Sequence, residues 1–186
     1  MTEEHTNPYE INLDRTPANH VPLTPLTWIE RAAAIYPEKE AVVHGTRKYT
    51  WSETFTRCKK LCSALKRKGI RKGDAVAVLA TNIPAFYECL FGVPAAGAII
   101  NPINIRLDSD AIAFIIDHGE AKILITDTEF SSVVRDALKK CSSNPLVIDI
   151  SDEESPSDDR LGEIEYEEYI EAGDADSPWT LPDDEW

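Results

Sequence analysis

No apolar run in this sequence approaches the roughly 20 residues that a helix needs to cross a membrane. Residues 1–14 are polar and carry several acids, whereas a signal or transit peptide combines basic residues with an apolar or amphipathic stretch. The chain is therefore expected to be soluble. Its 186 residues, of which 42% are hydrophobic, are enough for one folded lobe with a core of its own.

Cysteine is scarce, and the four that occur form no CxxC pair and have no histidine at metal-ligand spacing. Because no secretory leader precedes them, we expect reduced thiols. Cys58 and Cys62 lie four residues apart on a predicted helix, which leaves a redox or metal pair as an alternative. We favour two small buried hydrophobic side chains, because nothing else that binds a metal accompanies them.

Basic residues are almost absent from the end of the chain. Residues 151–186 hold 15 of the 33 acids and a single base, Arg160, so this segment carries the net charge of −14 and residues 1–150 are neutral. A neutral body argues against nucleic-acid binding, which requires a basic face to replace counterions. The acidic segment is predicted to be mostly solvated, except for one short turn around Tyr166 and Ile170 that docks on the body. An acidic interaction tail is the alternative.

The common catalytic motifs are absent as well. The sequence contains no GxxxxGK[ST] or GxGxxG phosphate loop, no GxSxG nucleophile turn, no HExxH zinc helix and no cluster of histidines and acids at metal spacing. His44 and His118 each stand next to a glycine, and we interpret them as turn or helix-end residues rather than general bases. No catalytic residue and no metal site are therefore predicted.

A regular series of helix and strand signals runs from residue 22 to residue 150. A Thr-Pro pair at residues 24–25 predicts the start of a helix, and the next proline ends it. AVVHG and RKYTW then predict two short strands joined by a glycine turn. A Thr-x-x-Glu capping box at residues 50–53 opens a second helix that ends at Gly69. The basic run KRKGIRKGD is interpreted as a solvated helix end, with contact to a phosphate as the alternative.

From Asp74 onward, apolar strands alternate with helices: DAVAVLA, IPAFYECLFGVPAAG, AIIN, SDAIAFIIDHG, AKILITD, EFSSVVRDALKK and LVIDI. Unbroken aliphatic strands indicate a parallel sheet that is covered by helices on both faces. Right-handed crossovers are expected between the strands. Pro94, inside the first of these helices, predicts a kink or an early end. The fold class is therefore α/β with a mostly parallel sheet.

Two polar loops follow strands at the edge where open α/β sheets bind ligands, and their sequences are ATNIP and NPINIRLDSD. Asn101 and Asn104 are expected to hydrogen-bond the backbone of the second turn, and Asp108 or Ser109 to cap the next helix. Arg106 is not explained by these roles. Its guanidinium is suited to pair with a ligand phosphate or with an acid of the same chain.

Four segments occur in a familiar order: LTWIERAAAIYPEKEAVVHG, YTWSE, GIRKGDAVAVLATNIPAFYECLFGVPAAGAIINPINIRLD and DHGEAKILITD. This ordered set resembles the amino-terminal part of the AMP-forming acyl-CoA synthetases, which belong to the adenylate-forming superfamily with luciferases and peptide-synthetase adenylation domains. The resemblance covers roughly residues 22–186 and is closest to medium-chain and aromatic acyl-activating enzymes of the plant and bacterial type. It implies the N-terminal lobe of the adenylate-forming fold, incomplete in this chain.

The resemblance implies a two-step ligase reaction. A carboxylate attacks ATP to give an acyl adenylate and pyrophosphate, and the thiol of coenzyme A then displaces AMP, with Mg2+ stabilising phosphate charge. The loop from Asn101 through Asn104 to Arg106 would lie on the side from which coenzyme A approaches. Family members hold ATP in a Ser/Thr/Gly-rich loop that ends in Pro-Lys-Gly and carry an adenylation lysine in a C-terminal domain, and this sequence contains neither. The chain alone is expected to be inactive and to have no cofactor of its own.

These observations divide the chain into an N-terminal extension (1–21), an α/β lobe (22–150) and an acidic, largely irregular segment (151–186) leading toward the family's phosphate loop. The alternative function is a non-catalytic short form that binds a partner or another copy over the incomplete sheet. A free-standing nucleotide-binding module is disfavoured, because no glycine-rich phosphate loop is present. The resemblance implies a cytoplasmic or peroxisomal location, and it leaves the acyl substrate open.

Overall fold

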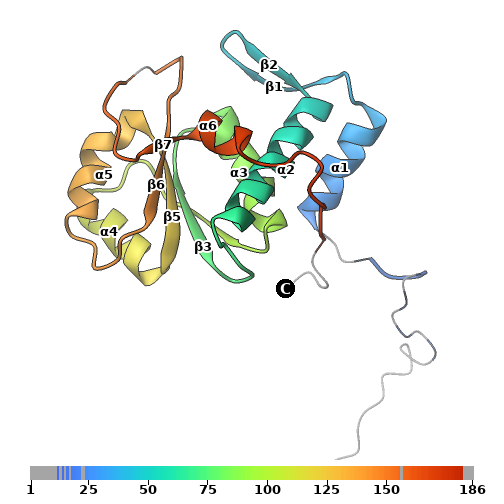
Figure 1. Ribbon diagram of the computed structural model, residues 1–186, viewed down its shortest axis with the longest axis horizontal. Coiled ribbons are helices and arrows are strands. Elements are labelled where there is room, and N and C mark those ends of the chain that lie inside the picture. The colour runs from blue at the N-terminus through green and yellow to red at the C-terminus, as the bar shows by residue number, and fades with distance from the viewer. Residues whose placement is uncertain are drawn as a thin grey trace, which may run out of the picture.

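The structure is a computed structural model that describes residues 12, 14, 16, 18–21, 24–155 and 157–181. Most of the predicted N-terminal extension and the last five residues of the acidic segment lie outside this part of the chain. The described residues form one parallel sheet with helices against both faces and a separate two-stranded hairpin (Figure 1). The predicted α/β architecture is confirmed.

The main sheet contains five parallel strands in the order β4-β3-β5-β6-β7. The chain enters at β3, moves to the edge strand β4, and returns past β3 to β5, so the direction of strand addition reverses between β3 and β5. The hairpin pairs β1 with β2 in antiparallel register. The strands are β1 (Glu40–His44), β2 (Arg47–Thr50), β3 (Ala75–Leu79), β4 (Ile99–Pro102), β5 (Ala121–Asp127), β6 (Leu146–Ile150) and β7 (Ile164–Glu165).

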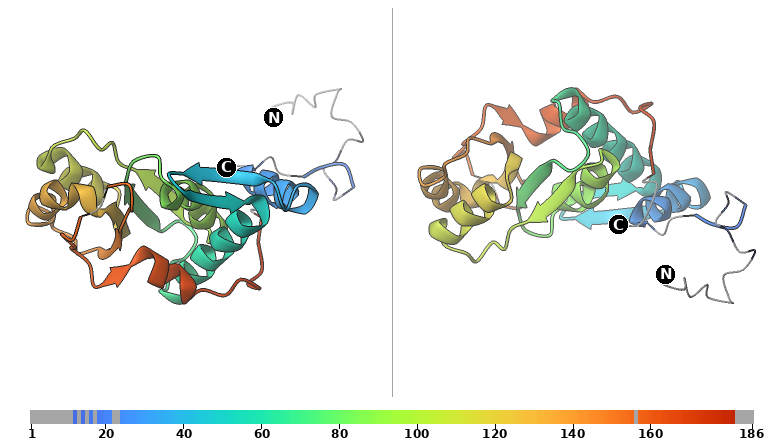
Figure 2. Two further views of the ribbon diagram at one scale, coloured as in Figure 1. Left: turned by 90° about the horizontal axis from the view of Figure 1, so that it is seen from above. Right: turned by 90° about the horizontal axis from the view of Figure 1, so that it is seen from below.

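The helices form two layers. Helices α2, α3 and α6 cover one face of the sheet, with α1 packed outside them, and α4 and α5 cover the other face (Figures 1 and 2). The helices are α1 (Pro25–Ile35), α2 (Trp51–Arg67), α3 (Pro84–Ala95), α4 (Ser109–His118), the 3₁₀ turn η2 (Thr128–Phe130), α5 (Ser131–Leu138) and α6 (Tyr166–Glu171).

Side chains of the central strand β3 alternate between these two layers. Val76 and Val78 belong to the apolar cluster under α2 and α3, whereas Ala77 and Leu79 belong to the cluster under α4 and α5. All four side chains are 0% exposed. Because both faces of a parallel sheet are covered, the strand is an unbroken apolar run rather than an alternation of apolar and polar residues.

Local signals place the helix ends as the sequence predicts. The Thr24 hydroxyl accepts a hydrogen bond from Leu26 N at 3.3 Å at the start of α1. Thr50 and Glu53 form the capping box that opens α2, with hydrogen bonds of 3.2 and 2.8 Å. Helix α3 ends one residue after Pro94, which is the early end expected of an internal proline.

Part of the acidic segment returns to the body. β7 pairs with β6, and in α6 the side chains of Tyr166 and Ile170 are both 0% exposed. Further on, Trp179 Nε1 donates to the carbonyl oxygen of Leu26 at 3.3 Å, and its ring meets Phe55 edge to face at 5.0 Å. The predicted docking turn is therefore present, and it extends the sheet by one strand.

The cysteines are free thiols, and Cys58, Cys62 and Cys89 are buried between α2 and α3. Burial raises the pKa of each of these three thiols, because the thiolate is poorly solvated there. The residues that the structure describes contain no group of three or more His, Cys, Asp or Glu side chains that could hold a metal ion. The buried hydrophobic interpretation of Cys58 and Cys62 is confirmed.

Candidate functional site

The carboxyl ends of the five parallel strands lie along one edge of the sheet, which is where open α/β sheets place ligands. Loops leave this edge after β3 (residues 80–83), β4 (103–108), β5 (128–130) and β6 (151–155). Because the order of the strands reverses between β3 and β5, the loops that follow these two strands diverge. The candidate site therefore lies along this edge.

The loop after β4 contains two of the three predicted site residues. Asn104 Oδ1 accepts a hydrogen bond from Arg106 N at 3.0 Å, and the Asn104 carbonyl accepts one from Leu107 N at 3.2 Å. Asp108 Oδ1 then accepts from Ala111 N at 2.9 Å and caps α4. The predicted turn and cap are confirmed. The Arg106 side chain is exposed, and its guanidinium has no hydrogen-bond partner among the described residues.

Asn101, the third predicted site residue, lies elsewhere. It sits within β4 opposite Ala77, and a Cβ added to Gly119 would come 2.8 Å from its Nδ2. Asn101 therefore faces the junction of α4 and β5, where it lines a hollow of about 440 Å³ at the amino ends of the strands together with Asp74 and Lys122. The sequence placed both asparagines in one turn, and the structure separates them because β4 continues through Asn101 to Pro102.

A buried acid ends β5. Asp127 is 0% exposed, and its Oδ1 caps η2 by accepting from Glu129 N at 2.9 Å. Its Oδ2 and the hydroxyls of Thr128 and Ser131 are buried and have no hydrogen-bond partner within the described part of the chain. Burial raises the pKa of Asp127, and the neighbouring carboxylates of Asp152 and Glu129 add to the rise. This edge therefore holds a carboxyl group that is protonated more readily than an exposed aspartate.

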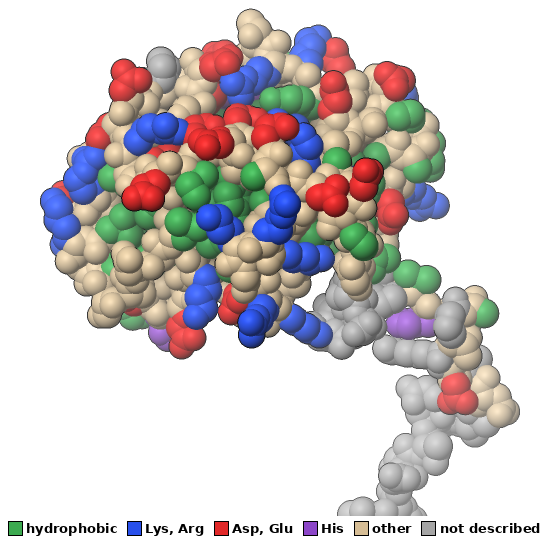
Figure 3. Space-filling model, in the orientation of Figure 1, with side chains coloured by type: hydrophobic (Ala, Val, Ile, Leu, Met, Phe, Trp, Pro, Cys, Tyr) green, Lys and Arg blue, Asp and Glu red, His purple; other side chains and the backbone are tan. Residues whose placement is uncertain are grey.

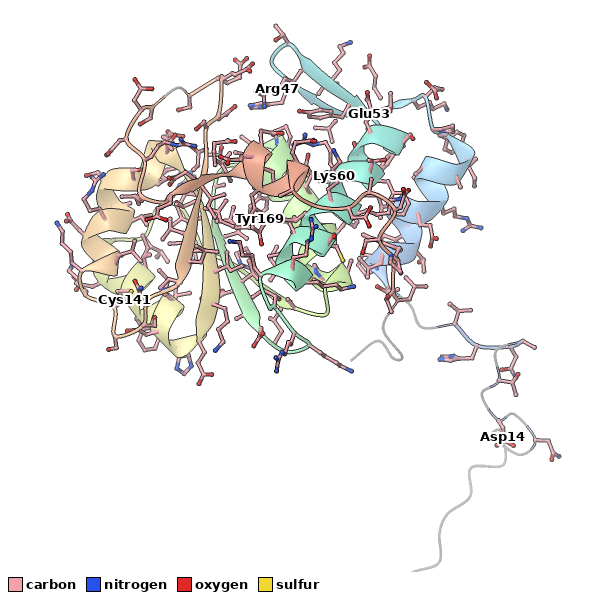
Figure 4. All side chains as sticks on the ribbon, viewed as in Figure 1. Asp14, Arg47, Glu53, Lys60, Cys141 and Tyr169 are labelled. Carbon is pink, nitrogen blue, oxygen red and sulfur yellow. The ribbon has the colours of Figure 1, made fainter. Side chains whose placement is uncertain are left out.

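Two polar pairs fasten the hairpin to the loop after β6. His44 Nε2 lies 2.8 Å from Asp152 Oδ1, and Asp152 is 8% exposed. Arg47 Nη2 donates to Glu153 Oε1 at 2.5 Å, and Arg47 projects from the hairpin in Figure 4. His44 was predicted to be a turn residue, and its contact with Asp152, 108 residues later, could not be read from its position beside Gly45.

An apolar groove lies between the hairpin and the start of α3 at the same edge. Its volume is about 370 Å³. The hairpin side is formed by Ala41, Val42, Val43 and His44, and the α3 side by Asn82, Ile83, Pro84, Phe86, Tyr87 and Leu90. The two elements lie side by side in Figure 2. The other predicted loop, ATNIP after β3, therefore borders an apolar groove rather than a cluster of polar groups.

A buried ionic cluster fixes α3 to α2 and α6. Arg57 Nε donates to Glu88 Oε1 at 2.6 Å and Arg57 Nη2 donates to Glu167 Oε1 at 2.7 Å, while the Tyr166 hydroxyl donates to Glu88 Oε2 at 2.8 Å. Burial lowers the pKa of Arg57, but the hydrogen bonds to Glu167 and Glu88 more than offset this and raise it. Burial raises the pKa of Glu88 against the opposing effect of Arg57. The cluster was not predicted, although a lone acid in the apolar helix 84–95 was its signal.

The basic run lies away from the candidate edge. Side chains of Lys66, Arg67, Lys68, Arg71 and Lys72 are exposed around the C-terminal end of α2 and the amino end of β3, where Lys and Arg gather in Figure 3. Arg67 Nη1 donates to the carbonyl oxygen of Ala172. The run behaves as the predicted solvated helix end. The basic run therefore contributes no cation to the loops at the carboxyl edge. In the loop after β4 the exposed cation is Arg106.

Taken together, the described edge offers an exposed guanidinium, a buried carboxyl group and an apolar groove. No glycine-rich phosphate loop and no metal-binding cluster occur within residues 24–155 and 157–181. No helix in the described residues is long and apolar enough to span a membrane. Along this edge the exposed Arg106 is the cation of the loop after β4, and the groove between the hairpin and α3 is lined mainly by apolar side chains.

Comparison with known proteins agrees with this architecture. The family model for AMP-binding enzymes matches residues 29–184. The peroxisomal acetate/butyrate–CoA ligase of Arabidopsis thaliana is 41% identical over 94% of this chain and 33% of its own length, and the acetate–CoA ligase of Humulus lupulus shows the same identity and coverage. The chain thus spans about a third of the length of these relatives.

Solved structures show the same fold. An anthranilate–CoA ligase in complex with anthranoyl-AMP superposes with a TM-score of 0.74 at 21% identity, covering 90% of this chain and 31% of that one. A long-chain-fatty-acid–CoA ligase from Archaeoglobus fulgidus also gives 0.74 at 21% identity, with 88% and 32% covered. At 21% identity the similarity to solved structures establishes the fold alone. Membership of the family is established by the match of the family model to residues 29–184. The chain belongs to the AMP-binding, adenylate-forming enzyme family.

Proposed function

We propose that this chain is the amino-terminal segment of an AMP-forming carboxylate–CoA ligase. In the complete enzyme a carboxylate and ATP form an acyl adenylate and pyrophosphate, and coenzyme A then takes the acyl group as a thioester. The observation that carries the proposal is the family match over residues 29–184, supported by relatives named as CoA ligases that are 41% identical over 94% of the chain. The names of these relatives, and of a benzoate–CoA ligase of Arabidopsis thaliana that is also 41% identical, make acetate, butyrate and benzoate the first carboxylates to test.

Within this proposal the described residues provide a framework rather than the reacting groups. They do not fit Mg2+, because they hold no cluster of carboxylates able to bind it. They also lack the backbone cradle that an ATP triphosphate needs. ATP and Mg2+ would therefore be held by polypeptide outside the matched third of the relatives.

Coenzyme A is the substrate that the described edge fits best. Arg106 is exposed and has no protein partner among the described residues, and the Asn104 turn fixes the backbone that carries it. A guanidinium in this position is suited to a phosphate of the coenzyme. Asn101 would contribute by packing against Gly119 at the end of α4 rather than by touching the ligand.

The Arg106 role is tested by Arg106→Ala in an enzyme that contains this chain and the remainder of the fold. The KM for coenzyme A should rise by about tenfold, since a hydrogen bond to a charged group is worth roughly 1.5–3 kcal/mol. The KM for ATP should stay unchanged. Arg71→Ala is the matched control, because Arg71 is also exposed but lies at the amino end of β3, at the opposite edge. An unchanged KM for coenzyme A would remove Arg106 from the site.

The ligase function is tested by pyrophosphate release and acyl-AMP formation. The 186-residue chain alone should release no pyrophosphate from ATP with acetate, butyrate or benzoate. Joined to the remaining two thirds of the Arabidopsis acetate/butyrate–CoA ligase, it should form the adenylate. Adenylate formation by the chain alone, or none by the well-folded joined protein, would contradict the proposal.

A second candidate, a non-catalytic short form that binds a partner, is favoured by the apolar groove beside α3. It predicts a stable complex of this chain without any ligase reaction. For the location, we propose the cytoplasm or the peroxisome, since several of the relatives are named as peroxisomal enzymes. Fluorescence microscopy of the protein tagged at its amino terminus distinguishes the two compartments.

A further inference from the structure

Residues 172–181 of the acidic segment, called the strap below, cross the molecule without forming a helix or a strand. The strap leaves α6, passes over α2 and reaches α1 (Figure 1). Its residues alternate between half-buried and exposed. The half-buried ones are Gly173, Ala175, Ser177, Trp179 and Leu181. A period of two is that of an extended chain lying along a surface, so one side of the strap faces the body of the protein.

The start of the strap lies tightly against α2. A Cβ added to Gly173 would come 2.0 Å from the carbonyl oxygen of Lys60, so a larger residue would require the backbone to move. Arg67 Nη1 donates to the carbonyl oxygen of Ala172, and Lys60 Nζ donates to Glu171 Oε1 at 2.7 Å. These contacts fix the place at which the strap leaves α6.

Trp179 fixes the other end of the strap. Its Nε1 donates to the carbonyl oxygen of Leu26 at 3.3 Å, and its ring meets that of Phe55 edge to face, with the centroids 5.0 Å apart. Lys59 Nζ lies 5.3 Å from the centroid of the same Phe55 ring. Trp179 and Leu181 both pack against the apolar cluster that contains Leu26. A tryptophan whose ring and N–H are both engaged, here by α2 and α1, is held in one orientation.

We propose that Trp179 is a positioning residue for the reaction of ATP, because it fixes the point from which the polypeptide that holds the triphosphate continues. This inference rests on the proposed function, in which ATP is held by polypeptide outside the matched third of the relatives. An amino-terminal segment places that polypeptide after the strap, and the family model matches as far as residue 184. A misplacement of about 1 Å can slow a reaction by about a hundredfold.

The two half-reactions separate this role from a general contribution to stability. Formation of the acyl adenylate requires the triphosphate of ATP. Transfer of the acyl group from a preformed adenylate to coenzyme A does not. A residue that places the triphosphate-binding polypeptide therefore acts on the first step, whereas a loss of folded protein lowers the rates of both steps by the same factor.

The test uses the protein formed by joining this chain to the remaining two thirds of the Arabidopsis acetate/butyrate–CoA ligase. Trp179→Ala should lower the rate of adenylate formation from ATP and butyrate by about tenfold or more, and it should raise the KM for ATP. Thioester formation from preformed butyryl adenylate and coenzyme A should keep the wild-type rate. Trp179→Phe keeps an aromatic ring beside Phe55 but has no N–H to donate, so it should recover part of the lost rate.

Trp28→Ala is the matched control. It removes the same side chain from α1, but Trp28 is 61% exposed, and its side chain forms no hydrogen bond or aromatic pair within the described part of the chain. Both half-reactions should keep their wild-type rates in this variant. An equal loss in Trp28→Ala and Trp179→Ala, or an equal loss of both half-reactions in Trp179→Ala, would overturn the proposal.

The anchor itself is tested without any activity, by hydrogen–deuterium exchange of the 186-residue chain. Peptides from the strap should exchange faster in Trp179→Ala than in the wild type, while α4 and α5 should exchange at the wild-type rate. Trp28→Ala should leave the strap as protected as in the wild type. Unchanged exchange of the strap in Trp179→Ala would mean that the indole does not hold it, and the proposal would be wrong.

Failure of the inference differs from failure of the proposed function. If the joined wild-type protein and Trp179→Ala form the adenylate at the same rate, the ligase function stands and the positioning role of Trp179 is refuted. If the well-folded joined wild-type protein forms no adenylate although its strap is protected from exchange, the ligase function is refuted, and the catalytic role of Trp179 is refuted with it.

Discussion

The helical layers on the two faces of the sheet differ in the charges that their outer sides carry. Helices α4 and α5 carry charged residues that pair with their surroundings: Arg135 of α5 pairs with Asp159 of the segment after β6, and Asp110 of α4 pairs with Lys140, which follows α5. Helix α3 carries no charge on its outer side, and its single acid is turned inward. The first layer meets water, and the second has the composition of a layer inside a larger fold.

The ionic interactions of the two layers differ in the same way. In the Arg57–Glu88 pair, which joins α2 to α3, the side chains are 14% and 1% exposed, whereas in the Arg135–Asp159 pair, which joins α5 to the segment after β6, they are 40% and 50% exposed. Removing one partner from a buried pair leaves an uncompensated charge, and removing one from an exposed pair leaves a hydrated one. Substitutions in each layer therefore test whether the two layers differ in this way.

Arg57→Ala should have the largest effect. It leaves Glu88 buried without its cation, and the free energy of unfolding should fall by about 3–5 kcal/mol in urea denaturation. Arg135→Ala is the counterpart on the other layer and should leave the urea midpoint nearly unchanged. Replacing both members of the buried pair, as Arg57→Met with Glu88→Gln, should recover much of the loss. Equal effects of Arg57→Ala and Arg135→Ala would show that the layers do not differ.

Gly92→Ala should have the next largest effect, through the contact between α3 and α2. Alanine normally stabilises a helix relative to glycine, but here its Cβ would come 2.7 Å from Leu61 Cδ2. We expect a loss of about 1–3 kcal/mol, as for other overpacked cores. A double-mutant cycle with Leu61→Ala should show that the two changes compensate in part. Strict additivity would mean that the two helices do not meet at this point.

Asp127→Asn should have a smaller effect of opposite sign. The raised pKa means that the folded protein holds the proton of Asp127 more tightly than the unfolded chain does. Wild-type stability therefore falls as the pH rises from below the ordinary aspartate pKa through the raised value. Asparagine keeps an oxygen for Glu129 N without the charge, so the variant should melt about 2–4 °C higher at pH 7. The difference should shrink toward pH 4, and a lower melting temperature at pH 7 would contradict this account.

Much of the fold could be predicted because its signals are local or periodic. The capping box at Thr50 and Glu53, the cap at Asp108 and the early end of α3 at Pro94 each depend on neighbours within a few residues. Strand 75–79 is unbroken and aliphatic, and this alone indicates a sheet covered on both faces. These features needed no knowledge of the tertiary structure.

The site was predicted less completely, because its contacts join distant residues. Asn101 and Asn104 look alike in sequence, but the end of β4 after Pro102 places one in a strand and the other in a turn. The pair between His44 and Asp152 connects residues 108 positions apart. Nothing in the spacing of either residue indicates the other.

Hydrogen–deuterium exchange by mass spectrometry tests the central claim most directly, with the 186-residue chain studied alone and with the remaining two thirds of the Arabidopsis ligase. The account predicts slower exchange on addition of that polypeptide in α3 and the facing strand β1, and unchanged exchange in α4 and α5. Protection of α4 and α5 with none in α3 would contradict it.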